Sequence, residues 1–169
     1  MQITAPKIVG PQDGITVDLA SVGVRFLLPS RETGGGFSLV EHPIPPRSLA
    51  APLHRHVHED EYTYVLEGKV GALLGDAVAV ARPGDLVLKP RAQWHTFWNA
   101  GDEPARILEI IAPAGFDQFF SELLDLGGVK NADPEAVGEL SARYGLEMDP
   151  DSVPALLERF GLVFGEADA

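Results

Sequence analysis

The chain has 169 residues, of which 45% are hydrophobic; this is enough for one well-buried core and short for two domains of ordinary size. Its 25 Asp and Glu outnumber its 13 Lys and Arg, and the formal net charge of −12 makes a nucleic acid or an anionic membrane surface an unfavourable partner. Cysteine is absent, which excludes disulfides, thiolate nucleophiles and sulfur-ligated metals, so any metal must be held by nitrogen and oxygen.

The N-terminal stretch MQITAPKIVGPQDG lacks the basic region and the apolar run of a secretory signal. No other stretch approaches the roughly 18 apolar residues that a membrane span requires. We therefore expect a soluble, cytoplasmic protein with no membrane partner and no nucleic-acid partner.

Between Gly14 and Ala112 the hydrophobic residues come in short runs, rich in β-branched and aromatic side chains and separated by Gly, Pro and Asp. Helical spacing is absent from these runs, so each one predicts a strand. The predicted strands are GVRFLL (23–28), FSLVEHPI (37–44), EYTYVLEG (61–68), KVGALLG (69–75), AVAVA (77–81), DLVLK (85–89), WHTFW (94–98) and ARILEII (105–111). Together they predict a largely antiparallel, all-β sandwich or barrel over residues 1–112.

After Pro113 the hydrophobic period changes to 3.6 residues, which predicts a short helical extension over residues 113–169. Gly and Pro at the expected end positions delimit three helices. The predicted helices span about 116–127, 133–145 and 152–161. We expect their apolar stripes to cover one face of the β unit or to form a dimer contact; a lid over a binding site is the alternative.

The stretch HRHVHEDE (54–61) has the geometry of a partial metal site. On a strand, His54 and His56 project to the same side with Cα atoms about 6.5 Å apart, so both imidazoles can reach one ion. In the following strand Glu61, Thr63 and Val65 share a face, which places a carboxylate at the head of a small, apolar surface. A divalent cation would compensate for burying that carboxylate.

A second window, WHTFWN (94–99), adds another histidine on a predicted strand. His95, Phe97 and Asn99 alternate with Trp94, Thr96 and Trp98, so one face carries the histidine. A compact sheet could bring His95 together with the histidines and the glutamate of the first window. This concentration of histidines favours a binding site over a scattered surface distribution.

These two segments resemble the two motifs of the cupin superfamily, G-x5-H-x-H-x4-E-x6-G and G-x5-P-x-G-x2-H-x3-N. The matching positions are His54, His56, Glu61 and Gly68 in the first motif, and Gly84, Pro90, His95 and Asn99 in the second. Ser48 and Ala92 stand where the motifs have glycine, which affects local turn geometry and leaves the ligand set intact. The resemblance covers about residues 37–112 and implies an all-β jelly-roll barrel with a metal inside. The subgroup that it most resembles is that of the quercetin dioxygenase-like single-domain cupins.

The motif spacing also bears on the acidic residues and histidine beside the ligands. If the first strand ended late, His56 and His58 could form the ligand pair, but Tyr62 would then stand in place of the carboxylate. We therefore interpret His58, Glu59 and Asp60 as a solvated turn, with a residue near the entrance of the site as the alternative for His58. Asn99 is interpreted as a hydrogen-bonding brace for its turn.

The resemblance implies one divalent transition metal, Fe, Mn, Ni, Co or Zn, held by three histidines and Glu61. Our leading hypothesis is a metal-dependent small-molecule oxygenase or related oxidoreductase, in which an enolate or phenolate binds the ion and Glu61 accepts a proton. A non-oxidative cupin enzyme (isomerase, decarboxylase, lyase or cyclase) is the second hypothesis. A non-catalytic cupin that binds a metabolite is the third.

Strand alternation predicts a substrate pocket lined by Thr63, Val65 and Phe97. Such a lining favours an aromatic or enolisable small molecule as the substrate. Glu41 shares a face with Phe37 and Leu39; it is a buried acid or base near the metal if that face is the interior, and a solvent-facing or salt-bridged acid otherwise. We also expect a homodimer, because barrel edges and the tryptophan-rich outer face need cover.

Overall fold

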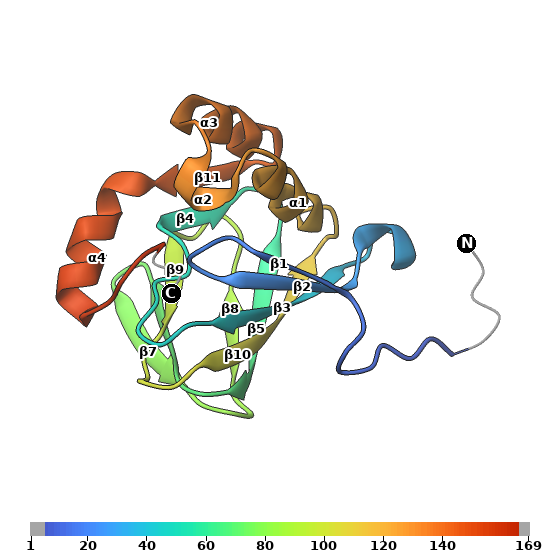
Figure 1. Cartoon of the computed structure of the whole chain (residues 1–169), viewed down its shortest axis with the longest axis horizontal. Coiled ribbons are helices and arrows are strands. Elements are labelled where there is room, and N and C mark those ends of the chain that lie inside the picture. Colours follow the sequence, from blue (N-terminus) through green and yellow to red (C-terminus); the bar gives the residue numbers. More distant parts are fainter. Residues whose placement is uncertain (1–5, 166–169) are drawn as a thin grey trace.

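The structure, a computed structural model, describes residues 6–165. Two antiparallel sheets face each other as a jelly-roll barrel (Figure 1). The six-stranded sheet has the order β1 (Ile15–Asp18), β2 (Gly23–Leu28), β3 (Ser38–Ile44), β10 (Ala105–Ala112), β5 (Asp60–Glu67) and β8 (Leu86–Lys89). The five-stranded sheet has the order β11 (Leu146–Asp149), β4 (Leu53–His56), β9 (His95–Asn99), β6 (Val70–Leu74) and β7 (Ala77–Ala81).

The eight predicted runs correspond to β2, β3 and β5 to β10, and β4 forms where the histidine pair predicts a strand. The all-β jelly-roll prediction is therefore confirmed. Two strands were not predicted, β1 and β11, and both are four residues long. Each is an outermost strand of its sheet. β1 is largely exposed and lacks alternating burial, and β11 (LEMD) is too short for its alternation to be distinctive.

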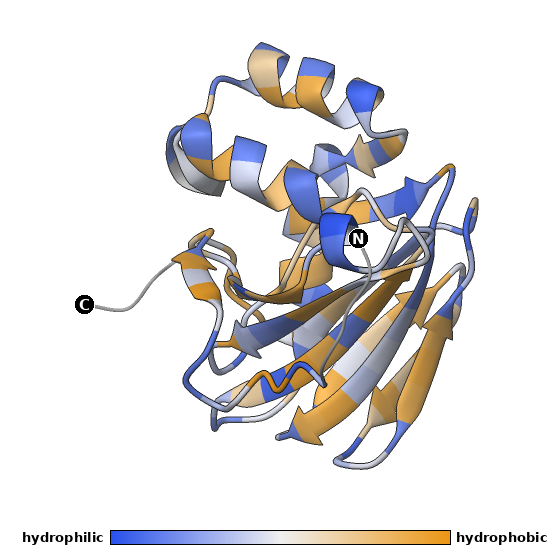
Figure 2. Ribbon diagram, turned by 90° about the vertical axis from the view of Figure 1, so that its right-hand side faces the viewer, coloured by the Kyte–Doolittle hydropathy of each residue, from blue (hydrophilic) through white to orange (hydrophobic). Residues whose placement is uncertain are grey.

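The C-terminal extension contains the three predicted helices, as α1 (Asp117–Asp125), α3 (Pro134–Arg143) and α4 (Val153–Phe160), together with a short α2 (Gly128–Asn131). Two 3₁₀ turns complete the structure, Ser30–Glu32 and Pro150–Ser152. Asp133 caps α3, because its Oδ1 accepts hydrogen bonds from the backbone of Glu135 and Ala136. The helices α1 and α3 lie over one end of the sheets (Figures 1 and 2).

The extension is also part of the barrel, which the sequence did not indicate. Strand β11 pairs with β4 in antiparallel register, with Leu146 opposite His56 and Met148 opposite His54. One hydrophobic cluster joins barrel residues such as Val40 to Phe119 of α1. A second cluster includes Trp98, whose ring stacks on that of Phe160 in α4 at a centroid distance of 4.2 Å. Residues after 112 thus complete both the sheet and the core.

None of the helices in residues 6–165 is long and apolar enough to span a membrane.

Candidate metal centre

The four predicted ligands come together inside the barrel from three strands. His54 and His56 lie on β4, His95 lies opposite His54 on β9, and Glu61 lies on β5 of the other sheet. All four side chains are buried, and each offers a ligand atom within 4.8 Å of the ligand atoms of the other three. Ligand atoms held about 2.1 Å from a common ion would be at most roughly 4.2 Å apart, so a small inward adjustment would close the cluster on a metal.

Backbone hydrogen bonds fix two of the imidazole rings in the tautomer that a metal requires. His54 Nδ1 lies 2.8 Å from the carbonyl of Pro52, and His95 Nδ1 lies 3.0 Å from the carbonyl of Gln93. Because a carbonyl can only accept, each Nδ1 donates and each Nε2 keeps its lone pair. This is the usual support for metal-binding histidines.

The unpaired atoms of the cluster also fit a cation. His95 Nε2 lies 3.1 Å from Glu61 Oε2, so a lone pair faces a carboxylate unless a proton or an ion lies between them. Among the described residues, neither ring nitrogen of His56 has a hydrogen-bond partner, although both are buried. A donor set of three imidazoles and one carboxylate suits a divalent first-row metal.

Electrostatics favour the protonation states that bind metal. Burial lowers the pKa of His54 well below its ordinary value and also lowers the pKa of His95, although Glu61 opposes the latter shift. Burial by itself would raise the pKa of Glu61, but the charges of Lys89, His56 and His95 outweigh it and hold that pKa well below its usual range. The site therefore favours neutral imidazoles at His54 and His95 and an ionised carboxylate at Glu61.

A buried lysine and a second buried glutamate lie next to the ligands, and sequence reasoning missed both. Lys89 Nζ lies 3.0 Å from Glu61 Oε2 and 3.1 Å from Glu109 Oε2, and Thr63 Oγ1 donates to Glu109 at 2.8 Å. Burial and repulsion by Glu61 raise the pKa of Glu109 to about 7 despite Lys89, whereas the two carboxylates raise the pKa of Lys89 against the effect of burial. One signal was available: Glu109 alternates with Ile107 and Ile111 on the apolar face of its strand.

His42 on β3, ahead of the first motif, is a third buried group that the sequence pattern did not single out. Val40, His42 and Ile44 form the inward face of this strand. Glu41 therefore points to the outer face, where its carboxylate binds Arg25 at 2.7 Å and Arg106 at 2.8 Å. Its interpretation as an acid or base beside the metal is wrong, and the salt-bridged alternative describes it.

The metal ligands open into a cavity of about 320 Å³, a volume suited to a small molecule. His54, His56 and Glu61 form one part of its wall, and Glu109 and His42 contribute further polar groups. Of the three predicted pocket residues, Phe97 lines the cavity. Thr63 instead supports Glu109, and Val65 lies in the hydrophobic core of the barrel.

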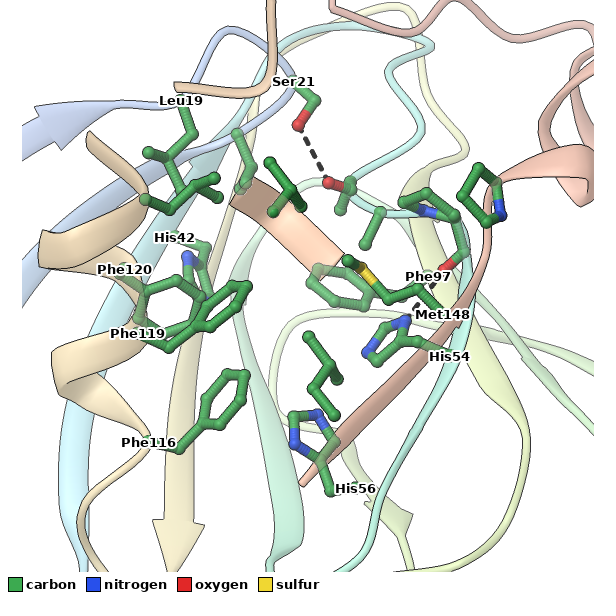
Figure 3. A pocket seen from close by; sticks show the side chains of 18 of the residues that line it. Leu19, Ser21, His42, His54, His56, Phe97, Phe116, Phe119, Phe120 and Met148 are labelled. Carbon is green, nitrogen blue, oxygen red and sulfur yellow. Dashed lines mark hydrogen bonds between the residues drawn. The ribbon is translucent and has the colours of Figure 1, made fainter. Parts of the chain in front are cut away.

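The extension supplies the apolar wall of this cavity. Phe116, at the start of α1, lies with its ring centroid 4.4 Å from that of His56, and Phe119 and Phe120 follow it (Figure 3). Met148 of β11 lies near His54. The helices therefore cover the β unit, as expected, and also enclose the candidate site, as the lid alternative proposed.

The turns around the ligands differ in part from expectation. Glu59 is buried, with Oε2 3.7 Å from His56 Nδ1, so it is not part of a solvated turn, whereas His58 is exposed. Ala92 adopts a left-handed backbone with φ of 61°, the conformation for which the motif has glycine, and its N–H donates to the carbonyl of His56 at 2.7 Å. Asn99 braces its turn as predicted, because its Oδ1 accepts from the backbone of Gly101.

Comparison with known proteins agrees with this architecture. The family model "Cupin domain" matches residues 41–111. No functionally curated protein matches the sequence significantly.

Three solved structures illustrate the structural similarity. KdgF from Halomonas sp. is 14% identical, with a TM-score of 0.59 over 66% of this chain and 99% of that one. A predicted oxalate decarboxylase from Thermotoga maritima is 19% identical, with a TM-score of 0.58 over 63% and 99%. The nucleoside dehydratase Pac13 from Streptomyces is 12% identical, with a TM-score of 0.55 over 68% and 88%. At these identities the similarity establishes the fold alone. The two motifs, the jelly-roll barrel and the domain match together identify residues 41–111 as a cupin domain.

Proposed function

We propose that this protein is a metal-dependent enzyme that acts on a small, mainly apolar molecule, and that it is an oxygenase or related oxidoreductase of the quercetinase-like type. The observation that carries the proposal is that the three-histidine, one-glutamate cluster adjoins an aromatic-lined cavity, with His54, His56 and Glu61 in the cavity wall. A bound ion would act there as a Lewis acid and redox partner for an enolate or phenolate oxygen. The phenylalanines of the extension would orient the apolar part of the substrate and exclude water.

The buried charges support an anionic substrate group. Glu61 and Glu109 contribute two negative charges when both are ionised, and Lys89 contributes one positive charge. With a divalent cation these groups sum to +1, which an enolate or phenolate would neutralise; the buried Glu59 beside His56 brings the sum to zero when it is also ionised. Protonation of Glu109 would make the sum more positive and the preference for an anion stronger.

The first experiment measures metal content per chain after purification without an affinity tag or chelator. We expect near-stoichiometric first-row metal in the native protein and its loss in His54→Ala combined with His95→Ala. His58→Ala is the matched control, because this neighbouring histidine is exposed and should not affect metal content. A folded native protein that stays empty after anaerobic addition of Fe(II), Mn(II) or Ni(II) would refute the proposal.

Oxygen uptake then tests the type of reaction. The metal-loaded protein should consume dioxygen with at least one catecholic or enolisable substrate, and the double variant should not. A panel of such substrates that gives no uptake, with metal present in stoichiometric amount, would argue against the oxygenase assignment.

Glu109 favours a second candidate, a non-oxidative isomerase, decarboxylase, lyase or cyclase. Its carboxyl group lines the cavity, and burial raises its pKa to about 7, so it could exchange a proton with a substrate at neutral pH. Anaerobic turnover by zinc-loaded protein, lost in Glu109→Gln, would identify this class. A tight ligand without turnover under either condition would instead indicate a binding protein.

We further propose that the protein is a homodimer. Exposed hydrophobic side chains on the two edge strands β7 and β8 support this proposal. A cytoplasmic location stays a prediction from the sequence.

A further inference from the structure

His42 combines burial, a fixed tautomer and an available lone pair. Its side chain is 3% exposed and lines the cavity. Its Nδ1 lies 2.8 Å from the backbone carbonyl of Gly23 on the neighbouring strand β2. Because the carbonyl only accepts, Nδ1 must carry a proton and donate it. In a neutral ring, Nε2 is then a bare acceptor.

Nε2 is the ring nitrogen of His42 that remains available for a ligand. Among residues 6–165, no hydrogen bond to Nε2 of His42 is found, whereas its Nδ1 is satisfied. The ring is surrounded by apolar groups, with the rings of Phe97 and Phe120 at centroid distances of 6.2 and 5.5 Å. Burial lowers the pKa of His42 to about 4, which keeps the ring neutral at physiological pH. An acceptor in the cavity wall that no donor of the described residues reaches is available for a hydrogen bond with a ligand.

The position of His42 separates it from the three metal-binding histidines. It lies on β3 of the six-stranded sheet, whereas His54, His56 and His95 lie on β4 and β9 of the five-stranded sheet. A molecule could therefore bind the ion beside these histidines through an oxygen and reach His42 on the other sheet with a second group.

We propose that His42 Nε2 accepts a hydrogen bond from a hydroxyl or N–H group of the small molecule that occupies the cavity. Together with the proposed function, on which this part rests, this hydrogen bond defines the substrate class. The substrate is an apolar, preferably aromatic molecule. Such a molecule carries a metal-binding oxygen at one end and a separate hydrogen-bond donor elsewhere. The hydrogen bond would fix the orientation of the apolar body relative to the ion.

The test uses phenol and fluorobenzene as probes on metal-free, uniformly ¹⁵N-labelled protein near pH 7.5. The two probes have similar shapes, but only phenol can donate a hydrogen bond. Phenol should shift the ¹⁵N resonance of His42 Nε2 upfield, and fluorobenzene should not. The resonance is assigned by its loss in His42→Phe or, where that variant does not fold, in His42→Gln.

Affinities provide a second readout. Removing the acceptor in His42→Phe should weaken the binding of phenol relative to that of fluorobenzene by roughly fivefold to tenfold. This is about what one buried hydrogen bond contributes to affinity. His42→Gln, whose amide oxygen can still accept, should retain part of the preference. His58→Ala is the matched control: it removes an exposed histidine that does not line the cavity and should leave the phenol-induced shift of His42 in place.

Phenol that binds without moving the His42 resonance, or that binds no more tightly than fluorobenzene, would overturn the inference. Because no metal is present, this outcome is independent of the proposed function. A protein that shows the His42 shift but holds no metal would contradict the proposed function alone.

Discussion

Lys89 is a fully buried cation whose charge is balanced by two carboxylates, those of Glu61 and Glu109. Replacing it with methionine would leave both carboxylates in a low-dielectric interior without their cation. We expect Lys89→Met to lower the free energy of unfolding by about 3 kcal/mol or more, because breaking a buried ion pair leaves an uncompensated charge. Urea denaturation of the metal-free protein measures this change.

A second substitution tests the origin of that loss. Adding Glu109→Gln to Lys89→Met removes one of the stranded charges, so the double variant should be more stable than Lys89→Met alone. If the stability loss of the double variant equals the sum of the losses of Lys89→Met and Glu109→Gln alone, the two side chains do not interact energetically.

His42 should also make the stability of the metal-free protein depend on pH. Its folded-state pKa of about 4 lies below the ordinary 6.5, so the unfolded chain binds a proton more readily than the folded protein. The stabilisation that His42 contributes to the folded protein is therefore complete above about pH 6.5 and is lost as the pH falls toward 4. Between pH 6.5 and 4.5 the native protein should lose about 2 kcal/mol more than His42→Gln, measured by urea denaturation. Parallel pH profiles for the two proteins would contradict this expectation.

Ala92 has a left-handed backbone at a position where the second motif has glycine. Glycine adopts this conformation without the steric cost that a Cβ atom incurs. We expect Ala92→Gly to raise the free energy of unfolding by about 0.5 to 1 kcal/mol, measured by urea denaturation. Ala79→Gly, at an exposed alanine inside strand β7, is the control and should be destabilising. A loss of stability in both variants would show that Ala92 is not strained.

Among the elements, α1 has two roles, because its buried face belongs to the core and also forms part of the cavity wall. Phe119→Ala should lower the free energy of unfolding by about 3 to 5 kcal/mol, since a large buried side chain leaves a void. Leu124→Ala on the same helix is the matched control; its side chain is 39% exposed, so the loss should be much smaller. Chemical denaturation measures both losses in the free energy of unfolding. Equal losses would show that α1 is not anchored through its cavity-facing side.

Strand β11 shows that the extension also acts through the sheet. It pairs with β4, the strand that carries His54 and His56, so the C-terminal segment holds both the ligand strand and the wall opposite it. This explains why one segment can influence the position of the ligands and the shape of the cavity together.

At the scale of the whole molecule, the edge strands β7 and β8 expose Val80 at 54% and Leu86 at 59%. If these strands form the homodimer contact, Val80→Glu combined with Leu86→Glu should convert the dimer to a monomer, because charges in an apolar interface are costly. Sedimentation equilibrium measures the change. Ile15→Glu, a similarly exposed hydrophobic residue on β1, should leave the dimer intact. A native protein that sediments as a monomer would refute the proposal.

Much of the fold and of the metal cluster could be predicted because both depend on local rules. Alternation along single strands placed His54 with His56 and placed Glu61 at the head of its strand, and the resemblance to the second cupin motif linked His95 to them. The limit of this reasoning is visible at Glu41. Alternation correctly separated its face from that of His42, but it could not tell which of the two faces was the interior.

The sequence by itself determined an all-β unit followed by a helical extension, because both follow from hydrophobic periodicity. The jelly-roll barrel and the four residues of the candidate metal centre followed from the resemblance of the two motifs to those of the cupin superfamily. Only the tertiary structure decided which further groups share the cavity. Lys89 meets Glu61 and Glu109 through the register of three strands, and His42 faces the cavity because of the way that the two sheets close. The physical reason is that such contacts join residues distant in the chain, whose proximity depends on strand pairing and packing that no local pattern contains.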